Sequence, residues 1–162
     1  MAPFFLIIQH HKLKKMIGQT AIDEHLLKAQ RLSDSEAWFE AHNSSVKKII
    51  LNLIRESQLR SKGIDENEKI IGLYSRATEI ISNGRKKAGD PFTLYDTGQF
   101  YRSMFIVVLK DSILIDADYT KMQDQDWWSI NILGLTEKNL DIYAEMVRQN
   151  YIKYARRILG IN

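Results

Sequence analysis

The chain has 162 residues, with 23 Lys and Arg against 20 Asp and Glu, and a formal net charge of +3. This length fits one domain with its own core, and apolar and charged fractions of 44% and 27% are those of an ordinary globular protein. The absence of cysteine excludes disulfides, thiolate metal sites and a thiol nucleophile. The apolar run at residues 4–8 is too short for a signal peptide or a membrane span, so we expect it to dock on the protein's own body or on a neighbour.

Charge is distributed unevenly along the chain. Residues 1–110 carry 17 basic and 12 acidic residues, residues 111–145 carry 2 and 8, and residues 146–162 carry 4 and none. Opposite charges on separate parts of one small protein suit head-to-tail self-assembly or contact with an unlike partner. Two solvated surfaces of unrelated sign are the alternative interpretation, because exposed ion pairs contribute little to stability.

Helices are expected over the first third of the chain. Residues 20–31 predict a helix with a thin apolar stripe, and residues 32–43 predict a short helix or an ordered linker. Ser44 or Ser45 can cap a clearer helix that ends near residues 60–63. Its apolar residues recur at the helical spacing, and they are Val46, Ile49, Ile50, Leu53 and Ile54.

Residues 69–91 have three predicted parts, a strand, a helix and a loop. Residues 69–74 predict a short strand, in which Gly72 marks a bulge or a close backbone approach. Residues 75–82 predict a short helix, and residues 83–91 form the most basic and most loop-like piece of the protein.

We expect the rest of the chain to pack around residues 93–118. A turn ends there at Gly98, and the five residues that follow it are too few and too aromatic for a free helix. The apolar runs at 104–109 and 112–118 flank a polar pair and predict a β-hairpin. The pair lacks the Asn-Gly or Asp-Gly of the tightest turns, so a slightly longer loop is also compatible with the sequence.

The last predicted element is a long helix. Thr136 suits its N-cap, Leu135 and Leu140 occupy the positions of a hydrophobic staple, and Gly160 ends it. Its predicted apolar face consists of Leu140, Tyr143, Ala144, Val147, Tyr151, Tyr154, Ala155 and Ile158. The whole pattern predicts an α+β fold, in which a small antiparallel sheet with a central β-hairpin is joined by N-terminal helices and a long C-terminal helix packed on the sheet.

Acidic and histidine side chains raise the question of a metal site. A carboxylate cluster could hold Mg²⁺ or Ca²⁺, but Lys121 and Trp127 stand where a helix–loop–helix calcium site needs Gly and Glu. The cluster consists of Asp116, Asp118, Asp124 and Asp126. The four His, at positions 10, 11, 25 and 42, lack zinc-motif spacing, which indicates structural or surface roles. We therefore expect no metal and no cofactor.

The glycine-flanked loop at residues 84–89 is the third candidate functional site, after the carboxylate cluster and the histidines. Arg85, Lys86 and Lys87 could contact the phosphates of DNA or RNA, an acidic patch on another subunit, or solvent alone. The loop lacks the pattern of a nucleotide-binding site. Because no nucleophile set stands out anywhere in the sequence, we expect that the protein is not an enzyme.

Residues 94–103 carry a resemblance to a known family. A leucine, a threonine-glycine turn, an aromatic pair and a serine precede an apolar hairpin, and this order resembles the signature of tailed-bacteriophage neck and tail-completion (head–tail connector) proteins. The residues concerned are Leu94, Asp96, Thr97, Gly98, Phe100, Tyr101 and Ser103. The stretch before them, Trp127-Trp128 and the long C-terminal helix are similar to proteins of phages of gut Bacteroidales, including the crAss-like group. The resemblance covers residues 64–159, and the first 60 residues depart from the pattern.

The resemblance implies a structural virion protein of the phage neck or tail, made in the cytoplasm of the bacterial host and lacking a catalytic site. Such proteins have an antiparallel sheet flanked by helices and form rings of six or twelve copies around the DNA channel. The implied partners are further copies of the chain, neighbouring portal, neck or tail proteins, and DNA passing through the channel, with no membrane. Residues 1–43 would then be an N-terminal helical extension, and residues 44–162 the ring-forming domain.

Two other functions remain open at this point. The basic loop at residues 84–89 could make the chain a nucleic-acid-binding protein, in keeping with a pI near 9.0. Asp116 and Asp118 could serve a metal-dependent nuclease. In a ring, the basic loop could instead face the acidic surface at residues 111–126 of the next protomer.

Overall fold

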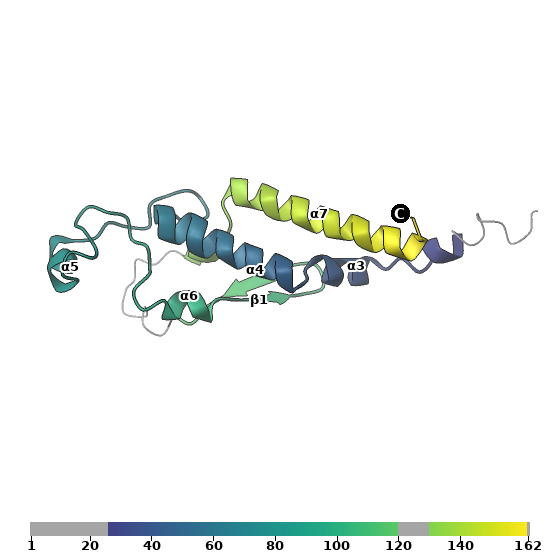
Figure 1. Ribbon diagram of the computed structural model, residues 1–162, viewed down its shortest axis with the longest axis horizontal. Coiled ribbons are helices and arrows are strands. Elements are labelled where there is room, and N and C mark those ends of the chain that lie inside the picture. Colours follow the sequence, from purple (N-terminus) through teal and green to yellow (C-terminus); the bar gives the residue numbers. More distant parts are fainter. Residues whose placement is uncertain (1–25, 120–129, 162) are drawn as a thin grey trace, which may run out of the picture.

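The computed structural model of the chain describes residues 26–119 and 130–161 and confirms the expected α+β fold (Figure 1). Two antiparallel strands, β1 (Phe105–Val108) and β2 (Ile113–Asp116), form its sheet. Its helices are α3 (Asp34–Ala41), α4 (Ser44–Asn52), the π-helix η1 (Leu53–Arg60), α5 (Arg76–Ile81), α6 (Gln99–Ser103), the 3₁₀-helix η2 (Ile130–Leu133) and α7 (Glu137–Leu159). The first part of the helix predicted over 20–31, together with Trp127 and Trp128, lies outside the described residues.

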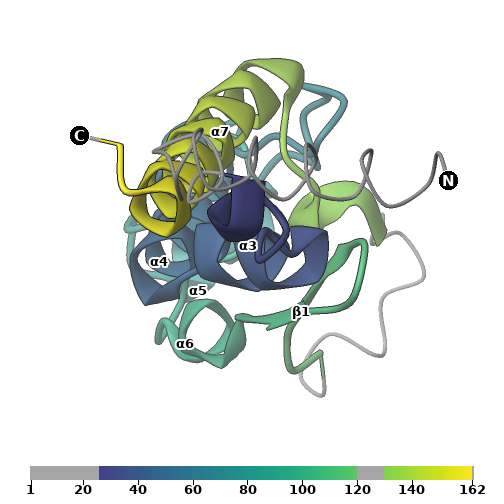
Figure 2. The ribbon, with the colours of Figure 1, turned by 90° about the vertical axis from the view of Figure 1, so that its right-hand side faces the viewer.

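The molecule is elongated, and its body has three layers (Figure 1). The helix α7 forms one side, α3 and α4 follow one another through the middle, and the hairpin forms the other side, as the end view also shows (Figure 2). The main contacts of α7 are with α3 and α4, and α4 is the helix that contacts β1. The long C-terminal helix therefore packs on the middle layer, and the prediction that it packs directly on the sheet is wrong.

The helix that begins at α4 changes its winding part of the way along. Asn43 caps it, because the Asn43 side-chain oxygen accepts hydrogen bonds from the backbone N–H groups of Ser45 and Val46 at 3.0 and 3.1 Å. The prediction of Ser44 or Ser45 as the cap is wrong by one position, since both are already helical. After Asn52 the chain continues as η1. The i→i+5 pattern of a π-helix lets residues five apart, such as Ile54 and Leu59, face the core together.

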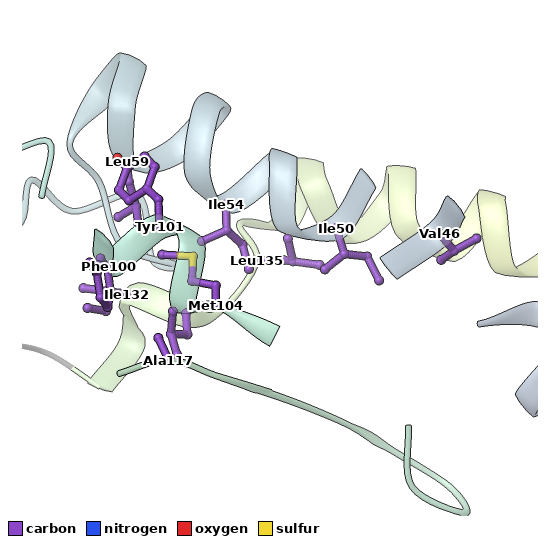
Figure 3. Close-up of a cluster of buried hydrophobic side chains, with 11 residues drawn as sticks. Val46, Ile50, Ile54, Leu59, Phe100, Tyr101, Met104, Ala117, Ile132 and Leu135 are labelled. Carbon is purple, nitrogen blue, oxygen red and sulfur yellow. The ribbon is translucent and has the colours of Figure 1, made fainter. Parts of the chain in front are cut away.

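The core lies where η1, α6, the hairpin and η2 meet (Figure 3). Ile50, Ile54, Leu59 and Ile132 are fully buried, and burial of each such side chain stabilises the fold by about 1.5–3 kcal/mol. The rest of the cluster consists of Val46, Phe100, Tyr101, Met104, Ala117, Leu133 and Leu135. These residues come from four separate stretches of the chain, so the core joins segments that are distant in sequence.

The predicted hairpin is confirmed, and its register pairs Phe105 with Asp116 and Val108 with Ile113. The Leu109 N–H donates to the Ser112 carbonyl at 2.9 Å and closes a tight turn around the two residues between them. The strand predicted over 69–74 is wrong. That segment forms only isolated bridges, one from Ile70 to Ile64 and one from Leu73 to Pro91, so no continuous ladder forms.

The C-terminal helix is confirmed from its N-cap Thr136 to Gly160, which ends it with a φ of +69°. Its predicted apolar face is only partly buried, since Leu140 is 47% exposed and Tyr151 is 40% exposed. The exposure of Leu140 argues against the predicted hydrophobic staple. The buried side of α7 is instead centred on Asn139, Tyr143, Met146, Val147, Asn150 and Tyr154, and it includes two asparagines that apolar periodicity does not find.

Candidate functional site

An arm projects from one end of the body, and α5 lies at its tip (Figure 1). We define the arm as residues 71–93. Its two sides run antiparallel, with the Tyr74 N–H donating to the Asp90 carbonyl and the Gly89 N–H to the Tyr74 carbonyl, both at 2.9 Å. The Phe92 N–H donates to the Gly72 carbonyl at 2.8 Å. These bonds hold the arm in one conformation without a regular sheet.

Two glycines allow the base of the arm to pack closely. Gly63 has a φ of +62°, and a Cβ atom there would lie 2.5 Å from the Phe92 carbonyl oxygen. A Cβ atom on Gly72 would lie 2.4 Å from the Phe92 ring. The expectation of a close approach at Gly72 is therefore confirmed, and the neighbour is Phe92. A side chain on Gly63 would push the backbone of the arm away from the body, whereas one on Gly72 would displace the Phe92 ring within the arm.

The tip of the arm carries an apolar face that points to solvent. We define this tip face as Ala77, Ile80 and Ile81, which share one side of α5. Ile80 is 67% exposed and Ile81 is 82% exposed, and none of the six residues of α5 is buried. The helix is capped by Ser75, whose hydroxyl accepts from the Thr78 N–H at 3.2 Å. The fold thus forms a helix at the tip whose apolar side packs on nothing within the described chain.

The predicted basic residues lie on the loop that follows α5, and they have different environments. Lys86 is part of the arm itself, since its Nζ lies 3.2 Å from Asp96 Oδ1 and 5.7 Å from the centre of the Tyr74 ring. The Arg85 Nε donates to the Ser82 carbonyl at 3.1 Å. The side chains of Arg85 and Lys87 are exposed. Two of the three predicted cations are therefore open to a partner, and the third has a structural role.

A hollow of about 310 Å³ lies between the arm and the turn that follows it. Its lining includes two cations, Arg85 and Lys86, and two carboxylates, Asp90 and Asp96. Tyr74 lines it as well, and its hydroxyl lies 3.1 Å from the Thr93 Oγ1. The opposite charges balance, so this hollow favours neither an anion nor a cation as a ligand.

The first half of the predicted family motif forms a turn with two left-handed residues. Leu94 has a φ of +55°, which is unfavourable for a branched side chain, and Gly98 has a φ of +75°. The Thr97 carbonyl accepts from Arg102 Nη1 at 3.0 Å, and Asp96 holds Lys86. The residues therefore shape the chain between the arm and the hairpin.

The second half of the motif anchors this turn in the core. Phe100 and Tyr101 are 7% and 4% exposed, and the Tyr101 hydroxyl donates to the Thr93 carbonyl. Burial, the largest cause, raises the pKa of Tyr101 well above the usual value for tyrosine. Ser103 Oγ donates to the Phe100 carbonyl at 2.7 Å and accepts from the Asp118 N–H at 2.9 Å. The aromatic pair and Ser103 thus link the turn to the core and to the end of the hairpin.

Two of the predicted acidic residues, Asp116 and Asp118, lie at the end of the hairpin, which is away from the tip of the arm (Figure 1). Asp116 ends β2, and its Oδ1 accepts from the Ala117 N–H at 2.8 Å, while Asp118 follows on the exposed surface. Asp124 and Asp126 lie outside the described residues. Within 26–119 and 130–161, no three His, Asp or Glu side chains come together as metal ligands would.

The hairpin has a second apolar surface that sequence reasoning missed. We define this outer face as Phe105, Val107, Leu109 and Leu114, which are between 39% and 48% exposed. Strand alternation and the register put them on one side, and the other side, with Ile106, packs against the core. The hairpin lies at the edge of the molecule opposite α7 (Figure 2). The available signal was the unbroken apolar run of β1, which is typical of a strand covered on both faces.

Comparison of the chain with known protein families, with curated proteins and with solved structures gives no match. Among the described helices, none combines the length and the apolar character that crossing a bilayer requires. The functional interpretation therefore depends on the two exposed apolar surfaces, on the charges beside them, and on the motif between them.

Proposed function

We propose that this protein is a structural component of a tailed-phage virion, which assembles with further copies of itself into a ring at the head–tail junction and joins portal-proximal and tail proteins. The observation that carries the proposal is the pair of apolar surfaces, the tip face and the outer face, exposed at separate places on one elongated chain. Single exposed apolar residues are common, but clusters of them mark contacts with other proteins.

The turn and its anchors support the same proposal. The motif that resembles phage neck and tail-completion proteins forms a turn between the arm and the hairpin, and its aromatic pair fixes that turn in the core. A motif with this role sets the direction of the arm relative to the hairpin. Such control matters in a ring, where every subunit must present its surfaces to its neighbours at the same angle.

The proposal is tested by the native mass of the purified chain, measured by light scattering over a tenfold concentration range and at two salt concentrations. We expect a closed species of six or twelve copies, or a shift towards one as salt or concentration changes. Negative-stain images of that species should show rings. A mass that stays at 18.9 kDa under all conditions would contradict self-assembly of the chain.

Nucleic-acid binding is the second candidate, and the exposed cations at the tip of the arm favour it. Arg85 and Lys87 lie on the same arm as Arg76, whose side chain is 81% exposed. If these cations contact phosphates, affinity for a labelled DNA duplex should fall steeply with salt. Changing Arg85 and Lys87 together to Glu should then reduce both the affinity and the salt slope. Equal binding by this variant and the wild type would exclude the arm as the DNA contact.

A further inference from the structure

We infer that the tip face of one copy docks on the outer face of the hairpin of the next copy, so that the chain assembles head to tail. This inference deepens the proposed function and rests on it, because it names the surfaces through which a ring would form. In this contact, the outer face of the hairpin is covered by the tip face of a second copy of the chain.

Both surfaces are apolar, and no described part of the chain covers either of them. The tip face presents two adjacent isoleucines, and Ile81 is 82% exposed. The outer face presents Phe105, Val107 and Leu114 from two adjacent strands, which together form a nearly flat apolar surface. A short helix that lays an apolar side on such a surface removes both from water at once, and the gain grows with the area covered.

The charges around the two surfaces are complementary. The arm, residues 71–93, carries four Lys and Arg and two Asp and Glu, whereas residues 104–118 of the hairpin carry one Lys and three Asp. The register puts Asp116 opposite Phe105 on the outer-face side. Arg85 and Lys87 are exposed on the loop that follows α5. The arm as a whole is net positive and the hairpin net negative, which favours this pairing over tip-to-tip or hairpin-to-hairpin contact, both of which bring like charges together.

The positions of the surfaces make the contact an intermolecular one. The tip of the arm lies at one end of the elongated molecule, and the hairpin lies along its body (Figure 1). Gly63 of the body packs against Phe92 at the base of the arm, and the tip lies apart from the hairpin of its own copy. A contact between two different surfaces repeats from copy to copy, and it closes into a ring when the rotation between copies allows.

Two variants, each lacking one surface, test the inference. The tip variant carries Ile80→Asp and Ile81→Asp, which are tolerated by the fold because both side chains are exposed. The face variant carries Leu114→Lys, at a position 48% exposed, where lysine also suits an edge strand. A control variant, Leu140→Lys, changes a leucine of nearly equal exposure, 47%, on α7. Circular dichroism of all three checks that the fold is kept.

We expect the control to assemble like the wild type and each test variant alone to remain a monomer, with subunit affinity at least about 30-fold weaker. An equimolar mixture of the tip and face variants should form a dimer of twice 18.9 kDa and nothing larger. In that dimer, the intact tip of the face variant docks on the intact hairpin of the tip variant. This outcome is specific to a head-to-tail contact.

Other results overturn the inference in distinguishable ways. If the wild type assembles and both variants assemble equally well, the ring uses other surfaces, and the proposed function stands without this contact. Dimers of the face variant alone would indicate a tip-to-tip contact, and dimers of the tip variant alone a hairpin-to-hairpin contact. A wild type that remains monomeric, with an outer face covered by another segment of its own chain, would overturn the proposed function as well.

Discussion

The side-chain oxygen of Gln58 accepts a hydrogen bond from the amide nitrogen of Asn139 at 2.7 Å, and both side chains are almost fully buried. The same oxygen accepts from the Thr136 N–H at 3.0 Å, while Gln58 Nε2 donates to the Gly134 carbonyl at 2.9 Å. Thr136 occupies the N-cap of α7, yet its own side chain makes no capping hydrogen bond with any described group. Gln58, a residue of η1, therefore supplies the hydrogen-bond partners for the polar groups at the start of the C-terminal helix.

Replacement of Gln58 by Leu should destabilise the fold by about 2–3 kcal/mol. The change preserves the size of the side chain but leaves a backbone N–H, a carbonyl and the Asn139 amide without their buried partner. Urea-induced unfolding measures the loss, with Ser57→Leu as the control at the exposed neighbouring position. A loss below about 0.5 kcal/mol would mean that water replaces Gln58 at this junction.

Local sequence patterns predicted the position of the hairpin and of α7 well, because each element depends on the order of side chains within one continuous segment. The segment from Phe105 to Asp116 combines β-branched residues with a polar turn, and Gly160 supplies the left-handed residue that ends the helix. The buried face of α7 was misplaced, since the buried Asn139 and the partly buried Asn150 make hydrogen bonds to groups distant in sequence. Apolar periodicity carries no information about such partners.

The arm and the exposed surfaces were harder to predict from the sequence, for a different reason. Residues 71–93 are held by backbone hydrogen bonds and by the contact of Gly63 and Gly72 with Phe92, and none of these leaves a repeating pattern. Ile80 and Ile81 were expected in a short helix, but a helical pattern does not say whether an apolar side meets the same chain. The candidate residues Arg85 and Lys86 were adjacent in sequence, yet only the structure separates an exposed cation from one held by Asp96.

Tyr143→Phe should cost about 1–2 kcal/mol of unfolding free energy, because the Tyr143 hydroxyl lies 2.6 Å from the Nε2 of the buried His42. The His42 Nε2 would then have no partner, while the His42 Nδ1 keeps its hydrogen bond to the Trp38 carbonyl at 2.7 Å. Tyr151→Phe is the matched control. Its hydroxyl also bonds from α7 to α3, at 2.7 Å from Asp34 Oδ1, but the pair is exposed. Equal losses for the two variants in thermal unfolding would contradict the role of burial.

Alkaline pH should weaken the fold partly through Tyr101. Burial raises its pKa in the folded chain above the value of about 10 expected when unfolded, so the unfolded state loses the phenolic proton first. The contribution of this group is therefore complete below about pH 10 and is lost as pH rises from there towards the folded-state pKa. Tyr101→Phe should unfold more easily at pH 7, for lack of the bond to Thr93, but its stability should fall less between pH 9 and 11. Parallel curves for the two proteins in this pH range would rule out the linkage.

Gly63→Ala should loosen the arm without touching either exposed apolar surface. The new Cβ atom would lie 2.5 Å from the Phe92 carbonyl oxygen at a φ of +62°, so we expect a cost of about 2–4 kcal/mol from strain and crowding together. Gly84→Ala separates the two effects, since Gly84 has a φ of +74° but no described atom within 4 Å of its added Cβ. Hydrogen exchange of the amides of residues 71–93 should accelerate at least tenfold in Gly63→Ala and change little at the arm base in Gly84→Ala.

Gly63→Ala should also weaken assembly if the arm must be held at a fixed angle for its tip to reach another copy. Both isoleucines of the tip face remain in this variant, so the loss would come from the direction of the arm alone. Unchanged assembly would show that this direction does not bring the copies together.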